Sequence, residues 1–321
     1  MGYHILHVLQ HGAVLARERG FVVCRAQDQP ERRMPLDDIR AVVVAARGVT
    51  LTSSFISAVL ERDGIVLHCN EHYQPCGWTA PLARVVDLKA FQTQTARPRR
   101  LNERLWHEMV RIKTFNQVRV LAAKNVRSPH LELALRTGEF DEPNCARRYW
   151  QLYFPAIGWT GTKRDRKENT PPNQMLNYGY AVLAALCHRS LIIHGLLPQL
   201  GVRHKARYRA DPLVYDLMEP FRPVVELMLA EFMLEPDISM KAWARKVGTE
   251  LRDRRVQRGP YTLKLMDAID ASANSLARAY AEASYKLFWA PVLPEPQRCP
   301  DPSQNSTGSE TQPGLQATNN E

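Results

Sequence analysis

The spacing of apolar residues changes along the chain, and it predicts strands first and helices afterwards. Up to about residue 90, short runs rich in Val and Ile, such as IRAVVVAARG and GIVLHCN, are separated by Gly, Pro and Asp at strand lengths. One helix interrupts them, because Thr52 or Ser53 can cap SSFISAVLERDG, which ends at Gly64. These patterns predict a small N-terminal β-strand domain over residues 1–91.

The apolar period becomes helical after FQTQTARPRR, a polar stretch that predicts a linker over residues 92–100. In LNERLWHEMVRIK, apolar residues recur every three or four positions and form a stripe on one side of a helix. Similar patterns continue through most of the remaining chain. We therefore predict a larger all-α domain over residues 101–292, and an α+β fold class for the chain as a whole.

The composition changes once more near the end of the chain. Residues 293–321 are rich in Pro, Ser, Gln, Thr and Asn and contain few apolar side chains. Such a segment cannot bury enough apolar surface to offset the loss of chain entropy on folding. The sequence therefore predicts a disordered tail.

The charge balance points to a polyanionic partner. Lys and Arg number 43 against 33 Asp and Glu, which gives a formal net charge of +10. This excess favours nucleic acid over acidic lipid. The six cysteines form no CxxC pair, the first residues carry no signal-peptide pattern, and the most apolar long segment is interrupted by His188, Arg189 and His194. We expect a cytoplasmic protein that makes no use of a membrane.

Basic side chains gather in three segments that are candidates for contacts with DNA phosphates. The first is the polar insert GTKRDRKENTPP, the second is the HKARYR run, and the third is RKVGTELRDRRVQR, which we expect to be helical. The predicted nucleic-acid-binding residues are Lys163, Arg164, Arg166, Lys167, Lys205, Arg207, Arg245, Lys246, Arg252, Arg254, Arg255 and Arg258.

A histidine and two acids stand close together in LGVRHKARYRADPLVYDLMEPFRP. Asp216 and Glu219 are three residues apart, so they share one face of a helix, and His204 precedes them. Imidazole and carboxylate ligands without a thiolate suit Mg²⁺ or Mn²⁺. A third acid from another helix is needed, and Glu139, Asp141 and Glu142 are the candidates.

Several motifs in order resemble a known family. LMEPFRP after LGVRH, LNYGYAVL upstream, and E-x-x-x-A-R-x-Y-W before that are similar to the CRISPR-associated integrase, the first of the numbered Cas proteins, in the version of type II systems. The resemblance runs from the β-rich segment to about Phe288. It implies an N-terminal β domain and a helical domain that holds the active site.

The resemblance also implies the residues of that site. Glu142, His204 and Glu219 match the family's three ligands of a divalent metal, and they would be the catalytic residues. Asp216 and Arg222 match flanking polar positions that support the metal and the scissile phosphate. Pro143 favours the first helical position, which would make Glu142 the N-cap and leave Asp141 as an alternative ligand.

The function implied is a metal-dependent DNA integrase of CRISPR adaptation, which joins the 3′-hydroxyl ends of captured double-stranded DNA into the repeat array by transesterification. The resemblance implies a homodimer, two copies of which flank a dimer of a small ferredoxin-like Cas subunit. Two alternatives remain open from the residues alone. One is a metal-dependent nuclease acting on branched or single-stranded DNA, and the other is a non-catalytic basic protein that binds nucleic acid.

Overall fold

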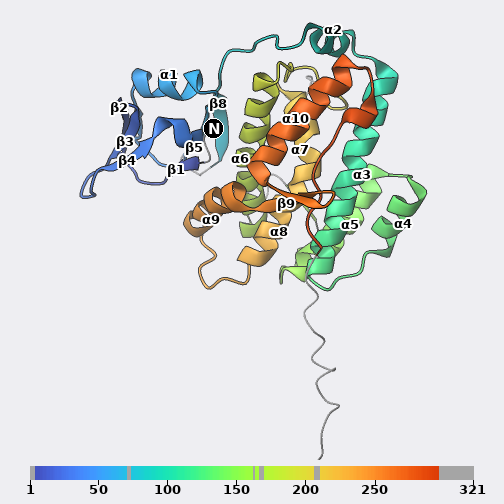
Figure 1. Ribbon diagram of the computed structural model, residues 1–321. Helices are drawn as coiled ribbons and strands as arrows, with labels where there is room; N and C mark the ends of the chain where they lie inside the picture. Colours follow the sequence, from blue (N-terminus) through green and yellow to red (C-terminus); the bar gives the residue numbers. More distant parts are fainter. Residues whose placement is uncertain (1–3, 71–73, 162, 166–169, 206–209, 296–321) are drawn as a thin grey trace, which may run out of the picture.

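The strands near the N-terminus form two four-stranded sheets, drawn in blue at the left of Figure 1. This computed structural model describes residues 4–70, 74–161, 163–165, 170–205 and 210–295. One sheet has the strand order β4-β3-β2-β6 and the other β1-β5-β7-β8, in which β1, β5 and β7 are parallel. The strands are β1 (His4–Val8), β2 (Val14–Glu18), β3 (Phe21–Arg25), β4 (Arg32–Pro35), β5 (Ile39–Val44), β6 (Thr50–Leu51), β7 (Ile65–Cys69) and β8 (Pro75–Thr79).

Strand β5 is buried along its full length because both of its faces are covered. Successive side chains of a strand point to opposite faces, and in β5 the two faces enter different cores. Val42 and Val44 pack in a smaller core with the other sheet and with Phe55 of α1 (Ser53–Glu61). Ala41 and Val43 belong to the large core that the helices form. The predicted cap of α1 is confirmed, since the Thr52 side chain accepts a hydrogen bond from the backbone N–H of Phe55 at 3.3 Å.

Helix α6 lies between the sheets and the other helices, and it is buried on nearly every side (Figure 1). No helix in the described part of the chain is long and apolar enough to cross a membrane. The helices after α1 are α2 (Leu88–Ala96), α3 (Arg99–Ala123), α4 (Pro129–Thr137), α5 (Glu142–Ala156), α6 (Pro171–Ile193), α7 (Pro212–Met218), α8 (Arg222–Phe232), α9 (Met240–Asp253) and α10 (Leu265–Ala281), with 3-10 turns η1 (Leu36–Asp38), η2 (Glu219–Phe221) and η3 (Tyr285–Leu287).

The segment predicted as a linker, residues 92–100, is mostly helical. It contains the end of α2 and the start of α3, with a break at Arg97 and Pro98. Gln94 anchors α2, because its side-chain amide donates to the Leu197 carbonyl at 2.9 Å and its oxygen accepts from the Leu197 N–H at 3.0 Å. The polar sequence suggested a linker, but a polar helix can still pack in the fold when distant backbone groups satisfy the hydrogen bonds of its buried side chains.

The α+β fold class is confirmed, but the helical part also contains a short hairpin. Strands β9 (Arg255–Arg258) and β10 (Tyr261–Lys264) pair antiparallel where the sequence predicted a continued helix. Val256 is buried in the large core, and Gln257 pairs with Val292 far along the chain. This distant pairing favours the strand over the helix that the local pattern indicated.

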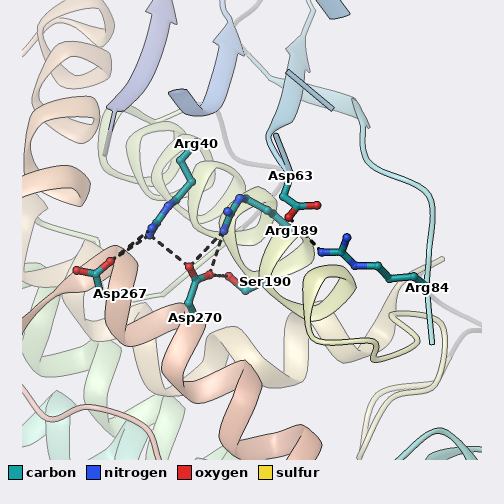
Figure 2. A network of polar contacts seen from close by, with 7 residues as sticks. All are labelled: Arg40, Asp63, Arg84, Arg189, Ser190, Asp267 and Asp270. Atoms are coloured by element: carbon teal, nitrogen blue, oxygen red, sulfur yellow. Dashed lines mark hydrogen bonds and ion pairs between the residues drawn. The ribbon is translucent and has the colours of Figure 1, made fainter. Parts of the chain in front are cut away.

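Buried charges fasten β5 to the helices, as Figure 2 shows. Arg40 of β5 is 3% exposed and lies 3.4 Å from carboxylate oxygens of both Asp267 and Asp270 on α10. Asp270 also forms an ion pair with Arg189 of α6 at 3.0 Å and accepts a hydrogen bond from the Ser190 hydroxyl. Removing Asp270 would leave the buried Arg40 and Arg189 without their shared carboxylate, so the cluster fixes how the sheet meets the two helices.

The first residue of the segment predicted as a disordered tail is instead part of the large core. Leu293 is buried and its N–H donates to the Asn116 side chain of α3 at 2.9 Å, while residues from 296 onward lie outside the described part of the chain.

Deleting residues 297–321 is expected to leave the melting temperature unchanged, because that segment has few apolar residues to bury. Deleting residues 293–321 should lower it, since Leu293 is removed as well. Equal melting temperatures for the two truncations would contradict this.

Candidate active site

Three parts of the helical region bring charged side chains to one place. Lys113 comes from α3, Glu142 from the first turn of α5, and Glu219 and Arg222 from the junction of α7 and α8. Pro220 has no N–H to continue α-helical bonding, and the chain forms the 3-10 turn η2 there. Because side chains three residues apart eclipse on a 3-10 turn, Glu219 and Arg222 project from the same side.

Glu142 is the first helical residue of α5, and it is not the N-cap. The cap is Asp141, whose side chain accepts a hydrogen bond from the Asn144 N–H at 3.4 Å. The sequence-based expectation placed the cap one residue too late, because Pro143 is tolerated anywhere in the first helical turn, where its missing N–H has no partner to lose. Asp141 is thus engaged locally, and Glu142, 38% exposed, lies 3.5 Å from the Lys113 ammonium.

Glu219 is a buried carboxylate held by two cations. Its Oε2 lies 2.7 Å from Lys113 Nζ, its Oε1 lies 2.9 Å from Arg222 Nε, and only 6% of the side chain is exposed. Burial alone would raise the pKa of Glu219, but the charges of Arg222 and Lys113 outweigh it and lower that pKa to about 2. The carboxylate is therefore ionised at neutral pH.

Asp216 is fully buried and fixes the loop that carries His204. It accepts hydrogen bonds from the backbone N–H groups of Val202 at 2.6 Å, Arg203 at 3.1 Å and His204 at 3.2 Å. It also accepts from His204 Nδ1 at 2.7 Å. Because a carboxylate can only accept, Nδ1 carries a proton, and in the neutral imidazole Nε2 is then the nitrogen with the free lone pair. A Cβ at Gly201 would lie 2.4 Å from the His204 carbonyl oxygen, so the loop requires glycine there.

Arg222 is turned into the protein rather than toward solvent. The side chain is 12% exposed, and its guanidinium lies over the Tyr180 ring at 4.8 Å in addition to pairing with Glu219. The Tyr180 hydroxyl donates to the buried carboxylate of Glu226 at 2.7 Å. This chain of contacts holds the guanidinium against Glu219.

The chemistry of the donors fits a divalent metal, although an ammonium lies among them. Two carboxylates and an imidazole whose other nitrogen is held by a carboxylate make a donor set found at metal centres. In the described part of the chain, no three His, Cys, Asp or Glu groups are arranged as a metal cluster. The Lys113 ammonium lies between Glu142 and Glu219.

Comparison with known proteins identifies the family. The model of the family "CRISPR associated protein Cas1" matches residues 6–139 and 141–250 of this chain. The chain belongs to the Cas1 family. A CRISPR-associated endonuclease Cas1 from Neisseria meningitidis serogroup C (strain 8013) is 33% identical over 228 residues, which are 68% of this chain and 73% of the relative. The resemblance inferred from the motifs is confirmed.

Solved structures share the fold of this Cas1 chain. A structure titled "Casposase bound to integration product" has a TM-score of 0.79 at 18% identity and covers 94% of this chain and 97% of its own. A chain of a "Cas6-RT-Cas1--Cas2 complex" has a TM-score of 0.68 at 17% identity, and the match covers 92% of this chain and 36% of that one. At these identities the likeness establishes the fold alone.

Sequence reasoning missed Lys113 in this Cas1 chain. A signal was present, because Met109 lies four residues before it and Asn116 and Gln117 follow at helical spacing, all three on the buried face of α3. A lysine on a buried helix face requires a carboxylate partner. The sequence could have shown that Lys113 was buried, but it could not have shown which acids form ion pairs with it.

The predicted phosphate-binding residues fall into three groups. Lys163, Lys205, Arg245 and Arg255 are exposed, and Arg258 lies over the Trp289 ring at 4.8 Å. Several others are paired with polar or acidic side chains: Arg164 with Asn173 and Asn177, Lys246 with Glu235, Arg252 with Asp253, and Arg254 with Glu231 and Glu250. Arg166, Lys167 and Arg207 lie outside the described residues.

Proposed function

We propose that this Cas1-family chain is a metal-dependent DNA integrase of CRISPR adaptation. The observation that carries the proposal is that two carboxylates from separate helical elements, Glu142 and Glu219, meet at the Lys113 ammonium, while Asp216 holds the imidazole of His204 through Nδ1. Family membership and the likeness to a casposase bound to integration product support it. The net charge of +10 suits a DNA substrate.

The proposed reaction is a transesterification. The 3′-hydroxyl oxygen of captured DNA bonds to a phosphorus at the edge of a repeat, the bond from that phosphorus to the neighbouring 3′ oxygen breaks, and the proton passes to the leaving oxygen. One phosphodiester replaces another, so no energy cofactor is needed. Mg²⁺ or Mn²⁺ held by Glu142, His204 and Glu219 would stabilise the charge that develops on the phosphoryl and leaving oxygens. Within the chain, Asp216 orients His204 and Arg222 steadies Glu219.

Hydrolysis at the same site is the second candidate, because the curated relatives are called endonucleases. The test combines the purified protein and its small partner with a supercoiled repeat-bearing plasmid, short duplex DNA and Mg²⁺ or Mn²⁺. Strands joined to the plasmid support integration, and free ends without joined strands support hydrolysis. DNA binding with neither product, or joining that survives chelation of the metal, contradicts the proposed function.

The partners we propose are double-stranded DNA and a small ferredoxin-like Cas subunit. A solved chain of this fold belongs to a complex whose title names Cas1 and Cas2, which supports such an assembly. We further propose a homodimer, with two dimers flanking the small subunit.

The salt dependence of DNA affinity distinguishes basic residues that contact DNA phosphates from those that stabilise the fold. Replacing exposed Arg255 or Lys205 with alanine should flatten the slope of log affinity against log salt by about 0.9 for each duplex phosphate that the side chain neutralises. Arg254→Ala should leave the slope unchanged and lower the melting temperature, because Arg254 pairs with Glu231 and Glu250. Binding of one duplex is measured at several salt concentrations. Slopes equal to wild type for the exposed positions would place the DNA surface elsewhere.

A further inference from the structure

The Lys113 ammonium takes the position that lies between two proposed metal ligands. It is 2.7 Å from Glu219 Oε2 and 3.5 Å from Glu142 Oε1, although these carboxylates come from different helical elements. Only 12% of the lysine side chain is exposed. With two carboxylates at these distances, the lysine is held as an ammonium. The Lys113 ammonium thus contacts both carboxylates, whereas Arg222 pairs with Glu219 and not with Glu142 in the described contacts.

The two cations at Glu219 differ in their freedom to leave. Arg222 is fixed, because its planar guanidinium lies over the Tyr180 ring, and Tyr180 is itself bonded to buried Glu226. Lys113 ends in a compact ammonium on a flexible four-carbon stem. Lys113 is as buried as Arg222, but its second partner Glu142 is more than one-third exposed, so solvent reaches the cluster at Glu142. Lys113 is the cation that can be displaced without breaking the packed chain of contacts behind Glu219.

We propose that Lys113 is a stand-in counterion, whose ammonium holds Glu142 and Glu219 together in the metal-free protein and is displaced when a divalent cation binds. The inference rests on the proposed function, because it takes both carboxylates as metal ligands. Two facing carboxylates without a cation would repel each other and turn apart. Lys113 therefore keeps the ligands in place before the metal arrives, and it weakens metal affinity because it competes for the same oxygens. It is a positioning residue and is assigned no contact with DNA.

Mn²⁺ affinity tests the competition directly. We expect Lys113→Met, measured by titration calorimetry on the full chain without DNA, to bind Mn²⁺ about tenfold more tightly than wild type, within the range usual for coupling between two ligands. Lys124→Met removes the same charge from the C-terminal cap of the same helix and should leave the affinity unchanged. Unchanged or weaker binding in Lys113→Met would overturn the proposal. Absence of Mn²⁺ binding in both proteins would overturn the proposed function as well.

Chemical labelling of the wild-type protein tests the displacement even if the methionine variant does not fold. An amine-acylating reagent should modify Lys113 slowly in the metal-free protein, where the ammonium is buried and paired, and faster once Mg²⁺ or Mn²⁺ is added. Lys124 in the same sample serves as the internal reference for mass spectrometry of the peptides. Equal modification of Lys113 with and without a bound metal would overturn the displacement. Tighter Mn²⁺ binding by Lys113→Met and faster labelling of wild-type Lys113 with metal would support this inference. If the protein nevertheless joined no strands, only the proposed integrase function would be rejected.

Discussion

Glu219→Gln is expected to abolish strand joining and to destabilise the protein, whereas Glu142→Gln should abolish strand joining alone. Glutamine at 219 leaves buried Arg222 without its carboxylate partner and Lys113 with Glu142 at 3.5 Å in place of its closer partner, and breaking a buried pair in this way costs about 3–5 kcal/mol. Glu142 is 38% exposed and meets Lys113 only at 3.5 Å, so its loss costs little stability. The integration assay and denaturant unfolding measure the two effects. Strand joining by Glu142→Gln but not by Asp141→Asn would show that Asp141 is the ligand.

Acidic pH should remove the difference in stability between wild type and Glu219→Gln. The pKa of Glu219 is lowered from 4.5 to about 2 in the folded protein. A carboxyl whose pKa is lowered by folding contributes stability above its unfolded pKa, and that stability is lost as the pH falls toward the folded pKa. The difference in the free energy of unfolding should therefore be complete at pH 7 and shrink between pH 4.5 and 2. A difference that stays constant with pH would mean that the ionised carboxylate is not its source.

Asp216→Asn is expected to lower the strand-joining rate about 100-fold and to destabilise the fold by about 2–3 kcal/mol. Asp216 accepts three backbone N–H bonds and the His204 Nδ1 bond with two carboxylate oxygens. The asparagine amide has one accepting oxygen, and its NH₂ group would face a donor. His204 would then be without the hydrogen bond that keeps Nε2 available.

The matched control for this variant is Asp253→Asn, which changes an exposed carboxylate paired with Arg252. It should leave both the rate and the unfolding free energy near those of wild type. If Asp216→Asn joins strands at the wild-type rate, His204 does not depend on Asp216 for its orientation, and the imidazole would have to be positioned by Trp106, whose ring meets it edge-on at 5.5 Å.

Local signals predicted most of the fold. The change from short Val- and Ile-rich runs to a helical period separated the sheets from the helices, and Thr52 marked the start of α1 because a cap acts within one turn. Features fixed by distant partners were not predictable in this way. Gln94 finds its partner at Leu197, and Gln257 pairs with Val292, so neither α2 nor β9 could be inferred from its own residues.

The candidate site was predictable as a set of residue types, through the motifs that match the family, but its electrostatics were not. The sequence indicated the acids and the histidine, and it could not show that Asp216 serves the loop of His204 while Glu219 is paired with Lys113 and Arg222. Charge counting likewise overstated the basic surface, because Lys246 and Arg254 pair with Glu235 and Glu231, acids that only the folded chain brings near.

Alternate residues of β5 pack into two cores, which makes the sheets and the helices a single cooperative unit. Val43 cannot leave the helical core unless the strand that also carries Val42 moves, and β5 lies in the middle of its sheet between β1 and β7. The free energy that stabilises the N-terminal sheets is therefore shared with the helices that surround Glu219 and the loop of His204. Partial unfolding of the sheets alone, with the helices still ordered, is disfavoured. Loss of sheet packing therefore also lowers the rigidity of the candidate site.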